Sequence, residues 1–239
     1  MKDKIFNEVE SIKNELFEMS DLIFDNPEMK FEEKFASNLL CEYLEKNGFK
    51  VEKGLGSLET AFKAKYSRGQ SKYNIGLLCE YDALSIGHAC GHQMQGPAIL
   101  GAAIAIKNTL KDKDYNLIIY GTPAEEGGGG KIKMLEEGYM KELDLALMMH
   151  GGPATQVDVK SMAASSRTVT FKGKSSHAAL KPEAGRSALD ALLLTFNGIE
   201  FLREHVLEDT RMHYTIAESP GPANTVPSKA IGEFSIRSY

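Results

Sequence analysis

Three near-continuous apolar segments, separated by helical patterns, most constrain the fold of this 239-residue chain. They are YNIGLLCEYDAL at residues 73–84, NLIIYG at 116–121 and LDLALMMH at 143–150. Apolar runs without alternation are typical of strands that are buried on both faces of a parallel sheet. The intervening segments, 96–110 and 129–138, have the composition of helices that pack on such a sheet. This order predicts a three-layer α/β domain with a mostly parallel sheet and right-handed crossovers.

Two amphipathic helices are predicted ahead of the first strand, at residues 4–24 and 31–47, with the turn-forming DNPEM between them. The N-terminus has neither the uninterrupted apolar run nor the cleavage site of a signal peptide. No apolar run approaches the roughly 18–20 residues that cross a bilayer, so we expect no membrane partner. The three cysteines are widely spread and do not form a disulfide pattern, which favours a cytoplasmic protein.

The sequence pattern changes near Ser165. The segments that follow are an alternating strand at 167–173, a long helix at 183–206 and two further alternating strands at 210–219 and 229–239. Strand–helix–strand–strand order predicts a smaller α+β domain with an antiparallel, ferredoxin-like sheet. We therefore expect a domain at residues 1–164 and a second one at 165–239.

The overall charge limits the kinds of partner that this chain can have. Its formal net charge is −5 and its pI is about 5.8, and no stripe of lysines and arginines offsets that balance. A nucleic acid or an anionic membrane surface requires the opposite charge. We expect a small molecule or another protein as the partner.

Clusters of potential metal ligands follow each of the three apolar strands. GHACGH spans residues 87–92, PAEEGGGG spans 123–130, and His150 ends the third strand. In open α/β sheets, ligands bind outside the carboxyl ends of the strands. The three clusters are therefore expected to meet in one crevice, although they are distant in the sequence.

The GHACGH cluster offers a thiol and two imidazoles. In an extended segment His88, Cys90 and His92 point to one side, whereas in a helical turn only the two histidines share a face. Either geometry presents good ligands for zinc and related metals. An isolated Cys–Gly–His would more often be a buried thiol near a loop histidine, and the two other clusters are the reason to prefer a metal site.

Glu125 and Glu126 are adjacent carboxylates, which point in different directions in an extended or turn conformation. One can bind a metal while the other faces water or substrate, as metal-assisted hydrolysis requires. The alternative is a pair of solvated glutamates at a helix N-terminus. Together with Cys90, His92 and His150, these residues exceed the three protein ligands of a simple catalytic zinc site, so a two-metal site is reasonable.

Three motifs, EYDALSIGHACGHQ, GTPAEEGGGGK and SSHAALKPEAGRSALDA, together resemble the metal-dependent aminoacylase and carboxypeptidase-like family of peptidases and amidohydrolases. The most similar branch is that of p-aminobenzoyl-glutamate hydrolases and aminoacylase-1-like dipeptidases. The resemblance implies a catalytic domain with two divalent metal ions (Zn, Mn or Co) and a smaller lid domain through which members form homodimers. It also implies hydrolysis of an N-acyl amino acid, an aminobenzoyl-glutamate-like compound or a dipeptide by a metal-bound water.

The resemblance also assigns roles to particular residues. It implies that Glu125 is the general base and that Asp82 orients the metal ligands without binding the metal itself. It also implies that His177 stabilises the oxyanion in a neighbouring subunit's site. His88 is left as a loop residue or a neighbour of the ligands. The implied metal ligands are Cys90, His92, Glu126 and His150, and the residues implied to hold a substrate carboxylate are Asn224 and Arg237.

The sequence departs from the family pattern in three places. Gln93 stands where an aspartate or asparagine is usual, and Ser85 where a proline often follows. No histidine occupies the position of the family's last metal ligand, so we expect the N-terminal part of an enzyme, with both domains incomplete. One alternative is a truncated, non-catalytic remnant that dimerises or binds a partner. Another is a cysteine hydrolase using Cys90 with a neighbouring histidine, which leaves Glu125, Glu126 and His150 without a role.

Overall fold

The computed structural model describes residues 1–157 and 159–239, and it forms two compact units, Met1–Thr155 and Gln156–Tyr239. The predicted division at residues 164 and 165 falls inside the first strand of the second unit, β6 (Ala163–Lys172). That strand opens with the small and polar residues AASS, which have no hydrophobic alternation, so the pattern becomes visible only a few residues after the strand begins.

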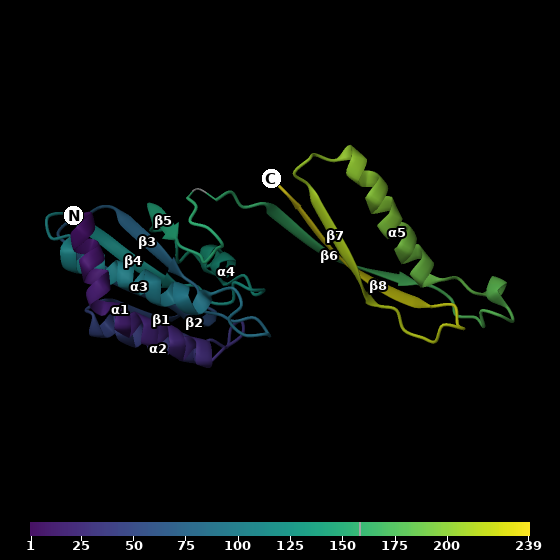
Figure 1. The fold of residues 1–239 in the computed structure, drawn as a ribbon, viewed down its shortest axis with the longest axis horizontal. Coiled ribbons are helices and arrows are strands. Elements are labelled where there is room, and N and C mark those ends of the chain that lie inside the picture. The colour runs from purple at the N-terminus through teal and green to yellow at the C-terminus, as the bar shows by residue number, and fades with distance from the viewer. Residues whose placement is uncertain (158) are drawn as a thin grey trace. The chain divides into compact units, whose positions relative to one another are not determined.

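The first unit contains a five-stranded sheet in the order β1-β2-β4-β3-β5 (Figure 1). Strands β4, β3 and β5 are parallel and correspond to the three apolar runs, whereas β2 pairs antiparallel with both β4 and β1. The α/β class is confirmed, with a mixed sheet whose antiparallel part was not predicted. The strands are β1 (Lys50–Leu55), β2 (Leu58–Arg68), β3 (Asn74–Cys79), β4 (Tyr115–Gly121) and β5 (Leu145–Met148).

Helices cover both faces of this sheet. The four are α1 (Lys2–Asp25), α2 (Lys34–Lys46), α3 (His92–Thr109) and α4 (Gly130–Glu136). The first three pack on one face around a core that includes Leu40 and Leu100, and the short α4 contributes Met134 to a second core on the other face (Figure 1). The helix α3 approaches α1 closely, because a Cβ at Gly101 would lie 2.5 Å from Leu16. The absence of a side chain at Gly101 therefore permits this packing.

The parallel strands bring the predicted clusters to one edge of the sheet. The register pairs Leu78 of β3 with both Tyr120 of β4 and Met148 of β5, so all three strands end side by side. The segments that follow them carry Asp82 to His92, Glu125 and Glu126, and His150. The carboxyl edge of the sheet is therefore where chemistry is expected.

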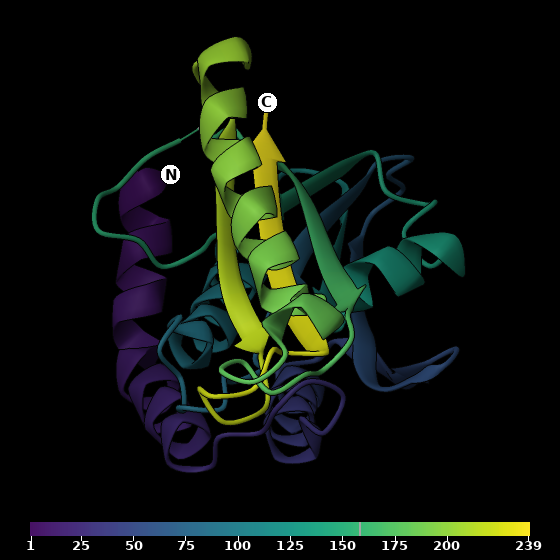
Figure 2. The ribbon, with the colours of Figure 1, turned by 90° about the vertical axis from the view of Figure 1, so that its right-hand side faces the viewer.

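The second unit is an α+β arrangement in the predicted strand–helix–strand–strand order (Figure 2). An antiparallel three-stranded sheet in the order β6-β8-β7 carries a helix on one face, with Leu192 and Phe196 of the helix packed against Phe234. Ser187 caps this helix by accepting a hydrogen bond from the Asp190 N–H, so the helix begins later than predicted. The further elements are α5 (Ala188–Leu202), β7 (Arg211–Glu218) and β8 (Lys229–Ser238). Across the residues that the structure describes, none of the helices is long and apolar enough to cross a membrane.

Candidate metal centre

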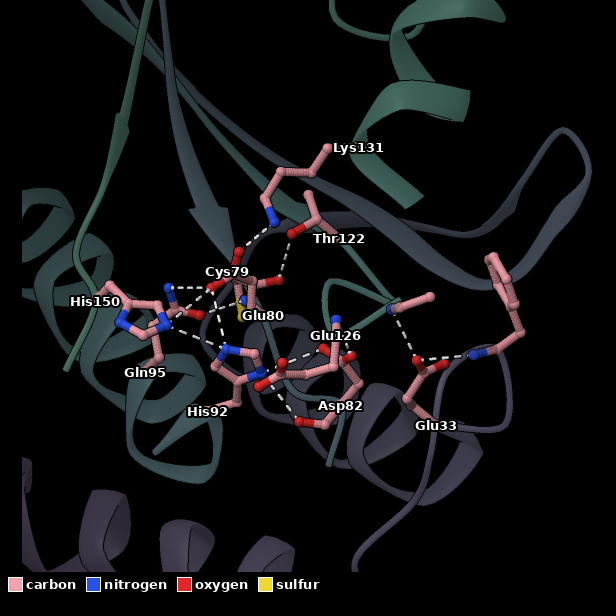
Figure 3. A network of polar contacts seen from close by, with 12 residues as sticks. Glu33, Cys79, Glu80, Asp82, His92, Gln95, Thr122, Glu126, Lys131 and His150 are labelled. Carbon is pink, nitrogen blue, oxygen red and sulfur yellow. Dashed lines mark hydrogen bonds and ion pairs between the residues drawn. The ribbon is translucent and has the colours of Figure 1, made fainter. Parts of the chain in front are cut away.

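His92 and His150 bring their ring nitrogens together at the carboxyl edge of the first unit's sheet. Their Nε2 atoms lie 3.3 Å apart (Figure 3). The Nδ1 of His92 lies 3.0 Å from the carbonyl oxygen of Asp82, and that of His150 lies 2.8 Å from the carbonyl oxygen of Gly151. Each Nδ1 faces an acceptor, and the neutral tautomer that carries its hydrogen there leaves a lone pair on Nε2. Two lone pairs that face each other are the arrangement that a cation stabilises.

The distance between these nitrogens fits a metal ion. Two nitrogens that are each about 2.0–2.1 Å from a tetrahedral zinc ion lie about 3.3–3.4 Å apart. Glu125 and Glu126 also fit, because each has a carboxylate oxygen within 4.8 Å of a His92 nitrogen and of one another. One oxygen of Glu126, Oε1, is buried without a hydrogen-bond partner among the described residues. The potential ligands form two groups that share His92, one with Glu80 and His150 and the other with Glu125 and Glu126, and such imidazole and carboxylate donors suit divalent transition metals.

Asp82 is a buried carboxylate that orients the neighbouring side chains. Its Oδ1 lies 3.2 Å from Nδ1 of His92, and its Oδ2 accepts a hydrogen bond from the Glu126 N–H at 2.8 Å. Burial opposes the charge of Asp82, but the adjacent His92 imidazole and the hydrogen bond from Glu126 outweigh it and lower the pKa of the carboxyl. Burial likewise opposes the charge of His92, and the Asp82 carboxylate outweighs it and raises the pKa of the imidazole. A carboxylate in this position commonly orients the ring of a metal-binding histidine and determines its tautomer.

Cys90 and His88 differ in exposure. Cys90 is exposed, and the Glu126 carboxylate, first as a hydrogen-bond acceptor and then as a neighbouring charge, raises the pKa of its thiol to about 11. His88 is buried, and both of its ring nitrogens lack hydrogen-bond partners in the described part of the chain. Burial lowers the pKa of His88, which keeps this imidazole neutral. The thiol of Cys90 is therefore beside Glu126 but outside the cluster formed by His92 and the two glutamates.

Three residues beside the site were not predicted from the sequence: Glu80, Gln95 and Lys131. Glu80 is buried, and its Oε2 lies 3.5 Å from Nε2 of His92 and 4.0 Å from Nε2 of His150 (Figure 3). Its Oε1 forms an ion pair with Lys131, and Gln95 donates to its Oε2 at 2.9 Å. Glu80 directly follows β3 in the EYD stretch, so its position at a strand end was the signal that could have identified it.

The predicted residues of the second unit lie at two separate places within that unit. His177 and Asn224 are neighbours, because His177 forms a β-bridge with Thr225 and the Ala178 N–H donates to the Asn224 carbonyl at 3.0 Å. Arg237 lies near the far end of β8, which begins at Lys229 and extends about 3.3 Å per residue. The structure thus groups His177 with Asn224 and places Arg237 elsewhere on the same unit.

Comparison with known proteins identifies the family. A model of "Peptidase family M20/M25/M40" matches residues 81–231, which is more than half of the chain and includes the predicted metal ligands Cys90, His92, Glu126 and His150. The chain belongs to this peptidase family. The resemblance drawn from the three motifs is confirmed.

Individual relatives support the same assignment. The chain is 37% identical to a p-aminobenzoyl-glutamate hydrolase subunit of Escherichia coli over 93% of its own length and 50% of that protein. It is 32% identical to the human Xaa-Arg dipeptidase over 88% of its own length and 52% of that protein. The chain thus spans about half the length of these curated relatives.

Solved structures of low sequence identity share the fold. A putative aminohydrolase from methicillin-resistant Staphylococcus aureus has a TM-score of 0.76 at 19% identity, and it covers 100% of this chain and 67% of its own. A dinuclear metal-binding M20 peptidase from Bacillus subtilis has a TM-score of 0.71 at 19% identity, with 96% and 65% covered. These similarities extend the fold assignment to the whole chain.

Proposed function

We propose that this chain carries the metal centre of a metal-dependent amidohydrolase or peptidase. The observation that carries the proposal is the convergence of His92, His150 and the Glu125–Glu126 pair at the carboxyl edge of the sheet. Two divalent ions, zinc, manganese or cobalt, would be held by His92, His150, Glu126 and Cys90. Such ions supply Lewis acidity and lower the pKa of water. The named relatives, a p-aminobenzoyl-glutamate hydrolase subunit and a dipeptidase, support the same reaction class.

Glu125 is the proposed general base. Its side chain is exposed, whereas the Glu126 side chain is partly buried and hydrogen-bonded to Cys90, and both carboxylates lie within 4.8 Å of a His92 nitrogen. In the proposed mechanism Glu125 accepts a proton from the attacking water and returns it to the leaving amine. Asp82 keeps Nδ1 of His92 protonated, so that Nε2 stays available as a ligand.

The second unit is proposed to act in a homodimer. The helix α5 exposes large apolar side chains, among them Leu194 at 70% and Phe201 at 76%, which a second subunit would cover. His177 would then reach a neighbouring subunit's site and stabilise the oxyanion. Asn224 and Arg237, being separated within one unit, would contribute to carboxylate binding from different subunits. A substrate with a free carboxylate follows: an N-acyl amino acid, an aminobenzoyl-glutamate-like compound or a dipeptide.

The cysteine-hydrolase alternative is not favoured by the structure. A nucleophilic thiol requires a lowered pKa, and the glutamates beside Cys90 raise its pKa to about 11. The two other cysteines, Cys41 and Cys79, are buried as free thiols, which is consistent with a reducing, cytoplasmic location.

The test uses the intact protein that carries this sequence. Hydrolysis of p-aminobenzoyl-glutamate, N-acetyl amino acids and dipeptides is measured after chelation and after restoring zinc, manganese or cobalt. We expect turnover only with metal, and we expect Glu125→Gln to reduce kcat by about 10²–10⁴-fold while metal content is retained. Glu126→Gln is the matched variant and should lose metal instead. Turnover that resists chelation, or full activity in Glu125→Gln, would reject the proposal.

A further inference from the structure

Glu33 is a fully buried carboxylate that lies outside the proposed ligand set. It immediately precedes α2, and its oxygens accept hydrogen bonds from three parts of the first unit. Oε1 accepts from the N–H groups of Phe31 at 2.9 Å and Ala124 at 2.8 Å. Oε2 accepts from the hydroxyl of Thr60 on β2 at 2.8 Å. The carboxylate therefore joins the turn before α2, the strand β2 and the loop after β4.

Phe31 and Ala124 share an unusual backbone conformation. Their φ angles are +64° and +58°, and within residues 1–157 and 159–239 they are the two non-glycine residues with positive φ. A residue with a Cβ avoids this left-handed region and keeps it only where its surroundings impose it. Both residues donate to the same oxygen of Glu33, and a Cβ at Gly128 would lie 2.5 Å from the Ala124 methyl and 2.6 Å from the Phe31 ring. One carboxylate thus holds both strained positions.

Ala124 directly precedes Glu125. The carbonyl of Ala124 accepts hydrogen bonds from the N–H groups of Gly128 and Gly129, both at 2.9 Å, which closes the turn that contains the glutamate pair. On the other side of Glu125, the N–H of Glu126 donates to Asp82 (Figure 3). The backbone of Glu125 is therefore held between two N–H groups, and each of these donates to a buried carboxylate.

We propose that Glu33 is a positioning residue for Glu125: it holds Ala124 in the left-handed conformation and so directs the Glu125 carboxylate toward the reacting water. This rests on the proposed function, in which Glu125 is the general base. The hydrogen bonds that Glu33 accepts from Phe31 and Ala124 depend on the length of its side chain and on an acceptor atom at its end. A glutamine keeps both, because its carbonyl oxygen can accept from Phe31 and Ala124 while its amide donates to Thr60. An aspartate keeps the charge but is one methylene too short to reach the same N–H groups.

The matched variants Glu33→Gln and Glu33→Asp separate length from charge in the intact, metal-loaded protein. We expect Glu33→Asp to lower kcat by about 100-fold with little change in KM, because a misplacement of about 1 Å has an effect of that size. Glu33→Gln should keep kcat close to the wild-type value. Thr60→Val is the structural control. It removes the hydrogen bond to Oε2 and should lower the melting temperature, but the hydrogen bonds from Phe31 and Ala124 to Oε1 remain, so kcat should not change.

Amide hydrogen exchange of residues 124–129, measured by mass spectrometry, supplies a readout that does not depend on activity. Exchange should accelerate in Glu33→Asp and stay unchanged in Glu33→Gln and Thr60→Val. Unchanged exchange in Glu33→Asp would overturn the proposed positioning role of Glu33. A Glu33→Gln variant that loses as much kcat as Glu33→Asp would overturn it too. A wild-type protein that hydrolyses no amide, yet shows the expected exchange pattern, would instead reject the proposed function.

Discussion

Lys131, the residue after the four glycines, forms an ion pair with Glu80, whose carboxylate lies beside the two histidines of the candidate metal centre. Only 1% of the Glu80 side chain is exposed, compared with 23% of the Lys131 side chain. A buried carboxylate is tolerated when a partner charge and hydrogen bonds compensate it. Lys131 and Gln95 supply these, and they hold the Glu80 carboxylate beside His92 and His150.

Removal of Lys131 is expected to destabilise the first unit. Lys131→Met leaves the Glu80 charge buried and unpaired, which should reduce the free energy of unfolding by about 3 kcal/mol. The double variant Lys131→Met, Glu80→Gln should recover part of the loss, because the unpaired charge is then absent. Urea denaturation measures both, with the exposed Lys113→Ala as the control. Equal losses in the single and double variants would show that Lys131 does not stabilise the protein by compensating the Glu80 charge.

His150 offers a direct test of the metal centre. It is more exposed than His92, so His150→Ala should remove a ligand with little effect on folding. Loss of a residue that merely supports a ligand lowers metal affinity by about 10–100-fold, and we expect a loss at least as large here. Isothermal titration of the metal-free protein with zinc measures the affinity. His205→Ala, an exposed histidine of the second unit, is the control and should bind zinc as the wild type does.

The central strands and the candidate site could be predicted because both depend on local patterns. The strands β3, β4 and β5 are near-continuous apolar runs, and parallel strands place whatever follows them at one edge of the sheet. The hairpin of β1 and β2 was not predicted. Charged residues such as Lys50, Glu52 and Lys63 interrupt its apolar pattern, and its strands receive their order from pairing with β4.

Residues that act through tertiary contacts could not be identified from local sequence patterns. Glu33 and Thr60 are 27 positions apart, and Glu33 and Ala124 are 91 positions apart. Each is unremarkable in its own segment, since Glu33 reads as a polar residue near a helix start. Their roles follow from a carboxylate that is buried where two loops and a strand meet. The exposed position of Cys90 was equally invisible, because the CGH spacing does not determine which way the thiol points.

The reactivity of Cys90 is expected to depend on Glu126. At a thiol pKa of about 11, roughly 1% of Cys90 is thiolate at pH 9, so alkylation by iodoacetamide should be slow in the metal-free protein. Glu126→Gln removes the acceptor and its charge, lowers the pKa of the thiol and should accelerate alkylation at pH 9 by about tenfold. Mass spectrometry gives the rate, with the buried Cys41 as an internal reference. A rate that Glu126→Gln leaves unchanged would show that the two side chains do not interact.

Glu142 should contribute stability that depends on pH. Burial opposes its charge, but hydrogen bonds from Lys63 and Tyr120 outweigh burial and lower the pKa of its carboxyl below the ordinary 4.5. A folded-state pKa below the unfolded value means that the stabilisation is complete above pH 4.5 and is lost as the pH falls through the folded pKa. Glu142→Gln should therefore reduce the free energy of unfolding at pH 7 by about 0.5–1 kcal/mol, and this difference should shrink toward zero as the pH is lowered below 4.5.

The matched control for Glu142 is Glu59→Gln. Glu59 pairs with Lys34 at 3.0 Å, but the two side chains are 77% and 62% exposed, so water and salt screen their interaction. Urea denaturation from pH 7 to pH 3 should show almost no effect of Glu59→Gln at any pH. A Glu142→Gln difference that stays constant down to pH 3 would mean that the lost stability comes from packing and not from the ionised carboxylate.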